Sequence, residues 1–356
     1  MLDEALVYWE RYPRVAAHNT GRAWLQIQAN LMLAPNTIDA YARGLEQYLS
    51  FSLENGIQVE TVSKDHVARY VHFLAKKPQP DGKRFRSIGS RVGLSNGTIQ
   101  LRLTVIRLYY DYLIEEGVRQ QHPVGRGQYT PGKRINAATH RGLIPRYKTL
   151  PKIPTEAEWQ RIICVMAEEP LRNRVMFALA YDAALRREEL CSLDLRDLDP
   201  AHRIMRIRPE ITKNRLERSI PYSEVSSRLL VSYVHQRRKV SRVQGKLFLS
   251  ESRRNRTEPL SIWTWSKVIK AVATRAGVSD FTTHTLRHLC LTDLARAGWD
   301  IHEIATFAGH RNTDTTLQYI HLSGRDLAEK LAKASDSLHE RRLSFMATVL
   351  HEKTEQ

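Results

Sequence analysis

Residues 117–155 divide this chain into two folding units. The stretch contains no Asp or Glu, and Pro and Gly recur along it closely enough to break any helix or strand. These breakers are Pro123, Gly125, Gly127, Pro131, Gly132, Gly142, Pro145, Pro151 and Pro154. We therefore interpret residues 121–152 as an interdomain linker, which suits a chain of 356 residues at roughly 150 residues per domain.

The linker region is also strongly cationic. Its basic residues are Arg119, Arg126, Lys133, Arg134, Arg141, Arg146, Lys148 and Lys152. A segment that wraps around a nucleic acid would need this composition, because each phosphate contact releases counterions; a plain flexible tether is the alternative. The formal charge of the whole chain, +17, likewise favours a polyanionic partner over a merely basic protein.

The cysteines and the apolar runs favour an intracellular protein. The cysteines lie in mainly apolar surroundings without a CxxC pair: Cys164, Cys191 and Cys290. We expect them to be reduced core residues, forming neither a disulfide frame nor a zinc site. Acidic residues near the N-terminus argue against a secretory signal, and runs such as residues 175–180 are too short to span a membrane. The sequence predicts a cytoplasmic, bacterial-type protein with no membrane partner.

Before the linker, the pattern predicts a small all-α bundle over residues 20–120, preceded by an N-terminal extension at residues 1–19. Asn36 is expected to cap a helix with one buried face, because apolar residues follow it with a period of 3.6. Ser63 and Ser95 are expected to open two further helices.

The loop between the last two of these helices is basic. It holds a single acid, Asp81, against Lys76, Lys77, Lys83, Arg84, Arg86 and Arg91. A solvated loop is the ordinary interpretation, but charge of one sign at this density more often meets phosphates. Together with Lys133 and Arg134 of the linker, these residues are the candidate DNA contacts.

After the linker, the pattern is mainly helical with one small antiparallel sheet. Thr155 caps the first helix through Glu158, and an apolar helix is expected over residues 172–190. Residues 203–208 alternate like a strand whose partner is residues 219–222. Lys213 falls in the turn between these strands. Further helices are expected at residues 261–277, 284–297 and 300–307, with another from 314 that carries Tyr319.

Arg186 is a candidate phosphate ligand. It follows an apolar segment and runs into Leu190 and Leu193, so part of its helix must be buried, and a buried Arg needs a partner or an anion. Glu189 is the expected local partner that positions it. A guanidinium suits phosphate because its planar fork donates two parallel hydrogen bonds and keeps its charge; a solvated helix face is the alternative.

The two histidines beside Arg287 allow a metal interpretation. His284 and Arg287 share one helix face, and His288 stands four residues after His284, the spacing of a helical zinc pair. A zinc hydrolase would want a Glu next to the first His, where Thr285 stands instead. His288 taken alone is as readily a core histidine, and we expect no metal site.

Tyr319 follows His310 by nine positions and is a candidate nucleophile. Its ordinary pKa near 10 leaves roughly one molecule in a thousand ionised at neutral pH, so it would need cationic neighbours and a base. Without such partners, a Tyr in this position is a half-buried helix aromatic.

The ordered set of these residues resembles the tyrosine recombinase (phage integrase) family over residues 155–325, and the bundle at residues 20–120 resembles its core-binding domain. The matching pieces are Ala184-Leu185-Arg186 with Glu189-Leu190, the Lys213 hairpin before Pro221, His284-x-x-Arg287-His288, Gly309-His310 and Tyr319. Thr212 and Asn214 replace glycines usual around the hairpin Lys, which makes Arg215 a rival to Lys213. Arg187 adds a second Arg, and Ala308 stands where Leu is common.

The resemblance implies a two-domain architecture, with a helical core-binding domain and a mixed catalytic domain at residues 153–330. Residues 331–356 would form a helical tail that docks in cis or on a neighbouring subunit. Tyr319 would attack a DNA phosphodiester to form a 3′-phosphotyrosyl bond, without metal or ATP. The other implied catalytic residues are Arg186 and Arg287 as oxyanion ligands, Lys213 as general acid, His284 as acid/base near the nucleophile, and His310 as a phosphate or Tyr319 contact.

The implied partners are double-stranded DNA, a homo-tetramer on two DNA sites and accessory DNA-bending proteins. The N-terminal extension and the basic loop favour a mobile-element recombinase that acts in integration, excision or transposition. The alternatives are a type IB topoisomerase, a non-catalytic DNA-binding protein with the same fold, and a metal hydrolase.

Overall fold

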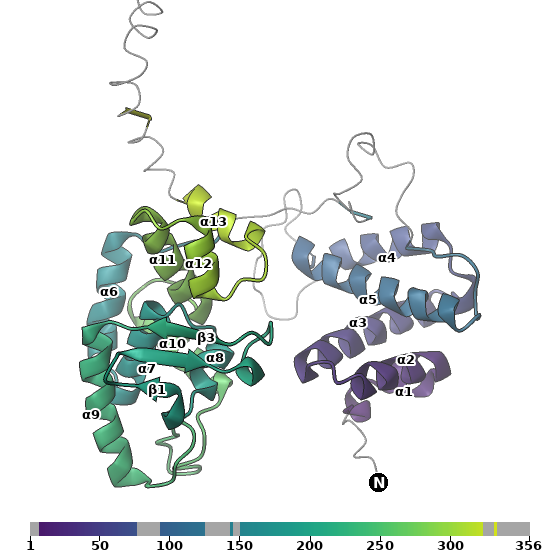
Figure 1. Cartoon of the computed structure of the whole chain (residues 1–356). Helices are drawn as coiled ribbons and strands as arrows, with labels where there is room; N and C mark the ends of the chain where they lie inside the picture. The colour runs from purple at the N-terminus through teal and green to yellow at the C-terminus, as the bar shows by residue number, and fades with distance from the viewer. Residues whose placement is uncertain (1–6, 77–92, 125–142, 145–149, 323–330, 333–356) are drawn as a thin grey trace, which may run out of the picture. The chain divides into compact units, whose positions relative to one another are not determined.

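The computed structural model describes residues 7–76, 93–124, 143–144, 150–322 and 331–332. The chain separates into two compact units, Met1–Thr149 and Leu150–Gln356 (Figure 1). Within the described residues, no helix combines the length and the apolar character needed to cross a membrane.

The described part of the first unit is entirely helical, as expected. Its elements are η1 (Trp9–Arg11), α1 (Pro13–Ala17), α2 (Asn19–Asn30), α3 (Pro35–Glu54), η2 (Val59–Thr61), α4 (Lys64–Lys76) and α5 (Asn96–Glu115). The Ser95 hydroxyl accepts a hydrogen bond from the backbone of Thr98, and Ser63 caps α4 in the same way, as predicted. The expectation for Asn36 was wrong, because Pro35 occupies the first helical position and Ala34 is the N-cap.

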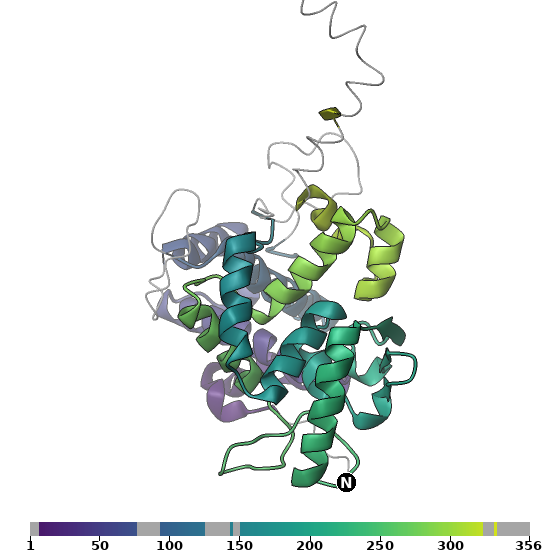
Figure 2. The same cartoon turned by 90° about the vertical axis from the view of Figure 1, so that its left-hand side faces the viewer.

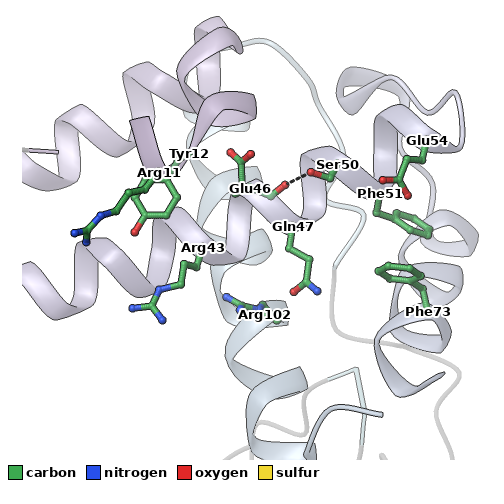
Figure 3. A pocket seen from close by; sticks show the side chains of 10 residues that line it. All are labelled: Arg11, Tyr12, Arg43, Glu46, Gln47, Ser50, Phe51, Glu54, Phe73 and Arg102. Atoms are coloured by element: carbon green, nitrogen blue, oxygen red, sulfur yellow. Dashed lines mark hydrogen bonds between the residues drawn. The ribbon is translucent and has the colours of Figure 1, made fainter. Parts of the chain in front are cut away.

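The core of this unit is rich in tyrosine. The buried hydroxyls of Tyr48 and Tyr110 lie 2.7 Å apart, and Tyr110 also donates to the carbonyl of Val59. Gly44 lets α3 approach α5 closely, since a Cβ there would lie 2.9 Å from Val105. Beside this core, a cavity of about 290 Å³ opens among α3, α4 and α5, with Arg43 and Arg102 on one side and Phe51 and Phe73 on the other (Figure 3).

The second unit is mainly helical with a small antiparallel sheet, which confirms the predicted fold class. Its helices are α6 (Glu156–Ala167), α7 (Leu171–Asp182), α8 (Arg187–Ser192), α9 (Glu224–Val240), α10 (Ile262–Arg275), α11 (Thr283–Arg296), α12 (Ile301–Ala308) and α13 (Asp314–Leu322), with 3-10 turns η3 (Leu195–Asp197) and η4 (Pro209–Ile211). Thr155 and Glu158 form the predicted capping box of α6. All three cysteines are free, but Cys164 is exposed on α6 rather than in the core.

The sheet has the order β1–β2–β3, with β1 at Leu198–Asp199, β2 at Ile204–Ile207 and β3 at Arg218–Pro221. Met205 pairs with Ile220, and both side chains are buried, so the alternating pattern turns one face of the hairpin toward the core. The predicted hairpin is confirmed; β1, only two residues long, carried no pattern of its own.

One helix expected from the sequence is interrupted just before Arg186, a candidate site residue. Residues 172–190 form α7 and α8, separated by a turn in which Ala184 has φ 45°. The Leu185 N–H bonds to the carbonyl of Ala180 and the Ala184 N–H to that of Tyr181, which is the Schellman pattern of a helix end. The chain therefore changes direction just before Arg186.

Helices α11, α12 and α13 pack on one another at one end of this unit, in yellow-green in Figures 1 and 2. A small apolar cluster joins them to the end of α7, separate from the main core: Ala184, Cys290, Leu291, Ile304, Ala308 and Tyr319. The predicted tail at residues 331–356 lies almost wholly outside the described residues.

Candidate active site

Arg186 begins α8 and is fixed there by Glu189. Its backbone N–H donates to Glu189 Oε2 at 2.9 Å, and its Nη1 donates to Oε1 at 2.8 Å. The pairing expected from the sequence is confirmed, and it exists because the break after α7 makes Arg186 the N-cap residue of a new helix.

Glu189 is fully buried between two arginines. Arg218 of β3 donates to Oε1 at 3.1 Å and to Oε2 at 2.7 Å, in addition to the two bonds from Arg186. Burial alone would raise the pKa of this carboxyl, but the hydrogen bonds and charges of Arg218 and Arg186 outweigh it and hold the pKa at about 2. The carboxylate therefore stays charged at all ordinary pH values.

We expect Glu189→Gln to lower the free energy of unfolding at pH 7 by about 3 kcal/mol, because two buried cations lose their shared anion. Since the folded pKa lies below the ordinary value of 4.5, this contribution is complete above pH 4.5 and is lost as the pH falls toward 2. In denaturant unfolding, the difference in the free energy of unfolding between wild type and variant should be smaller at pH 3 than at pH 7. Glu217→Gln, which breaks an exposed pair with Arg206, is the control with a smaller effect; equal losses for both variants would contradict the prediction.

Arg287 of α11 joins two helix ends and is 3% exposed. Nη1 donates to the carbonyl of Ala184 at the end of α7, and Nη2 donates to that of Ala308 at the end of α12, 2.6 Å away. Nη2 also lies 2.9 Å from His310 Nε2. Burial lowers the pKa of Arg287 to about 10, so it remains protonated. Of the five N–H donors of a guanidinium, these contacts use three and leave two without a hydrogen-bond partner in the described residues.

Gly309 ends α12 in a left-handed conformation, with φ 63°. Its carbonyl accepts hydrogen bonds from Arg186 Nη2 at 3.2 Å and from Asn214 Nδ2 at 3.1 Å. A Cβ at this position would lie 2.9 Å from the Arg218 guanidinium, so the close approach as well as the positive φ favours glycine. The C-terminal end of α12 thus binds the guanidinium of Arg186 and the amide of Asn214, which suits the negative end of a helix dipole.

The protonation of His310 follows from its partners. Arg287 only donates, so Nε2 of His310 must accept, and Nδ1 therefore carries the proton and donates to Thr316 Oγ1 at 2.9 Å. Burial first, and then the charges of Arg287, Arg186 and Arg218, lower the pKa of His310 to about 3. His310 is neutral, and both of its ring nitrogens are occupied.

Tyr319 of α13 is 1% exposed and lies within this cluster of charges. Its ring stacks on that of His310, with centroids 6.2 Å apart and an interplanar angle of 6°. Its hydroxyl lies 2.9 Å from Nδ1 of His288, which the sequence left undecided between a core histidine and a functional one. Burial raises the pKa of Tyr319, and the charges of Arg287 and Arg186 work in the opposite direction.

The structure brings Arg186, Arg287, His310 and Tyr319 together and leaves the side chains of Lys213 and His284 exposed. Lys213 is exposed in the turn between β2 and β3, and its neighbour Asn214 ties that turn to Gly309. His284 is exposed at the start of α11, where burial of part of the ring lowers its pKa and the neighbouring arginines add to the shift.

The turn that carries Lys213 is closed without the glycines usual in the family. The Thr212 hydroxyl donates to the carbonyl of Pro209 and accepts from the backbone N–H of Leu216 at 3.1 Å, while Arg215 takes the positive φ of 53°. Arg187 pairs with Glu188 and lies over the ring of Trp263, and its charge is one of those that lower the pKa of His284.

Among the candidate DNA contacts, only Lys76 falls within the described residues, exposed at the end of α4. Lys77, Lys83, Arg84, Arg86, Arg91, Lys133 and Arg134 lie outside them. In the described part of the chain, no group of three or more His, Cys, Asp or Glu residues could hold a metal ion.

Comparison with known proteins decides the family. Residues 153–325 match the phage integrase family, and residues 22–117 match the N-terminal SAM-like domain of phage integrases. The chain belongs to the tyrosine recombinase (phage integrase) family. The catalytic-domain match spans Arg186, Arg287, His310 and Tyr319, which the structure gathers in one place.

Two tyrosine recombinases illustrate the relationship. XerC of Herpetosiphon aurantiacus is 28% identical over 317 residues, which cover 88% of this chain and 92% of that protein. XerA of Pyrococcus furiosus is 28% identical over 300 residues, covering 82% and 93%. The chain is therefore a recombinase of the tyrosine class.

Solved recombinase–DNA complexes share the fold. XerH bound to palindromic difH after cleavage has a TM-score of 0.64 at 15% identity, with 93% of this chain and 90% of that one covered. The Tn1549 transposon integrase with circular intermediate DNA has a TM-score of 0.59 at 17% identity, covering 83% and 94%.

Proposed function

We propose that this recombinase cuts and rejoins DNA strands at specific sites through a 3′-phosphotyrosyl bond to Tyr319. The observation that carries the proposal is the convergence on the end of α12, where the carbonyls of Ala308 and Gly309 bind Arg287 and Arg186 and the adjacent His310 stacks on Tyr319. This arrangement sets two permanent cations beside a phenol, as attack on a phosphodiester requires.

The contacts support the roles of Arg186, Arg287 and His310, and the family resemblance supplies those of Lys213 and His284. Arg186 and Arg287 keep unused N–H donors for the nonbridging oxygens, and Glu189 holds Arg186 in place before DNA arrives. Lys213, exposed on its tethered turn, supplies the proton to the leaving 5′-oxygen. His310 is neutral and orients both Arg287 and the Tyr319 ring. His284 exchanges protons at the exposed edge of the site. Preorganised donors of this kind are each worth about a hundred- to a thousandfold in rate.

The partner is double-stranded DNA, bound by a homo-tetramer on two sites and assisted by DNA-bending proteins, in the cytoplasm. The core-binding domain at residues 20–120, the linker at 121–152 and the catalytic domain at 153–330 would each contact the duplex, and the tail at 331–356 would dock on a neighbour. A mobile-element origin remains our prediction; the Xer relatives favour a chromosomal role as the second candidate.

The experiment that tests the proposal traps the covalent intermediate. The protein is incubated with duplexes that carry a nick near the cleavage point, taken from DNA that flanks the gene, and run on a denaturing gel with and without EDTA. An adduct that forms in EDTA supports the proposal. No adduct on any DNA that the protein binds contradicts it, and relaxation of supercoiled DNA lacking a specific site favours a type IB topoisomerase.

We expect DNA affinity to fall steeply with salt, because the basic loop and linker release counterions from the phosphates. The logarithm of the binding constant should decline against the logarithm of salt concentration with a slope of about −0.9 for each phosphate contacted. Filter binding or anisotropy between low and physiological salt measures this slope. A flat dependence would contradict the assignment of Lys77, Lys83, Arg84, Arg86 and Arg91 to DNA.

A further inference from the structure

The hydroxyl of Tyr319 needs a proton acceptor, and the structure indicates which neighbouring side chain can serve as one. Attack on phosphorus releases the phenolic proton, whose pKa burial has raised, so a base within hydrogen-bond distance is required. Two histidines lie against Tyr319, His288 and His310, and a third, His284, lies beside His288. These histidines differ in whether their ring nitrogens are already engaged in hydrogen bonds.

His310 is fully engaged. Its Nε2 accepts from Arg287 and its Nδ1 donates to Thr316, so it cannot take a proton without breaking its contact with Arg287. Its contact with Tyr319 is between stacked ring faces, which offers no lone pair to the hydroxyl. His310 therefore orients the phenol but does not deprotonate it.

His288 is placed as an acceptor. Its Nδ1 lies 2.9 Å from the Tyr319 hydroxyl, and burial lowers its pKa to about 4, so the imidazole is neutral and keeps one free lone pair. In the tautomer that carries its proton on Nε2, the neutral imidazole presents the Nδ1 lone pair to the phenol, which donates its hydrogen bond to it. The negative charge of a bound phosphate would raise the basicity of His288 at the moment when the proton must leave.

We propose that His288 is the general base that accepts the phenolic proton of Tyr319. The inference rests on the proposed function, with Tyr319 as nucleophile. In the step, the Tyr319 oxygen–phosphorus bond forms and the bond from phosphorus to the 5′-oxygen breaks. The phenolic proton moves to Nδ1 of His288, and the leaving oxygen receives a separate proton from Lys213. The exposed ring of His284, with its centroid 6.4 Å from that of His288, provides the neighbouring group that exchanges with solvent.

His288→Asn is the decisive variant, because its amide oxygen can accept a hydrogen bond near the position of Nδ1 but cannot take up a proton at neutral pH. The formation rate of the covalent adduct should fall about a hundred- to ten-thousandfold in His288→Asn and equally in His288→Gln. DNA affinity and melting temperature should stay near those of the wild type. His235→Asn, an exposed histidine of α9, is the matched control.

A DNA substrate with sulfur in place of the bridging 5′-oxygen distinguishes the loss of the general base from the loss of the general acid. A thiolate leaves without a proton, so this substrate should restore the rate of Lys213→Ala but not that of His288→Asn. Wild-type rates in His288→Asn, or restoration by the sulfur substrate, would overturn the assignment. If Tyr319→Phe abolishes the adduct while His288→Asn is normal, the base assignment alone fails; if Tyr319→Phe still forms an adduct, the proposed function fails.

Discussion

Tyr319→Phe should form no covalent adduct with DNA while binding the same DNA with unchanged affinity. The substitution removes only the hydroxyl, so the nucleophile is lost, whereas the ring stays packed in the cluster with Ala308 and Leu291 and stacked on His310. Loss of the hydrogen bond to His288 should cost about 1 kcal/mol of stability. The expected effect on adduct formation is complete loss, the largest of any single substitution in this chain.

The measurement pairs the nicked-duplex trap with a binding assay on the same DNA. Tyr222→Phe is the matched control, because Tyr222 is buried in the same unit and its hydroxyl makes no hydrogen bond in the described structure. The control should form the adduct at the wild-type rate. An adduct in Tyr319→Phe would move the nucleophile to another residue and remove the basis of the proposed mechanism.

Arg287→Lys should reduce the rate of adduct formation by about a hundred- to a thousandfold even though the charge is retained. A single ammonium cannot span the carbonyls of Ala184 and Ala308, bond to His310 and still keep N–H donors free for a phosphate. The free energy of unfolding should also fall, because the two buried carbonyls would compete for one ammonium group. Single-turnover adduct formation at saturating protein measures the chemical step apart from DNA affinity.

Arg237→Lys is the control, because it replaces a buried arginine that lies outside the site. Arg237 is 4% exposed on α9 and donates to the carbonyls of Lys246 and Leu247. This control should lose stability but keep its rate per folded molecule. Equal rate losses in both variants would show that Arg287 acts through folding alone.

The second unit could be predicted closely at helix starts, which capping residues mark, and at strands, which alternating apolar residues mark. Thr155 with Glu158, the strand at residues 203–208 and its partner all lie where the pattern places them. The candidate site residues come from an order along the chain that resembles a known family, and the pairing of Arg186 with Glu189 follows from their spacing.

The break between α7 and α8 could not be predicted, because its signal is absent from the sequence. A left-handed helix end usually carries Gly, as Gly309 does, but here Ala184 takes the same conformation inside an apolar run. Tertiary contacts hold it: the Ala184 side chain is buried in the small cluster and its carbonyl is bound by Arg287. The proximity of His288 to Tyr319 could not be predicted for a related reason, since only the fold brings the two residues together.

Arg287 ties together two left-handed helix ends, those at Ala184 and at the close of α12, and this bridge has a consequence for how the site assembles. The same two ends orient Arg186 and precede His310 directly, so no one of these groups can shift alone. Displacement of α12 would release Arg287, Arg186 and the Lys213 turn in a single event. The candidate site residues should therefore assemble and separate as one cooperative unit.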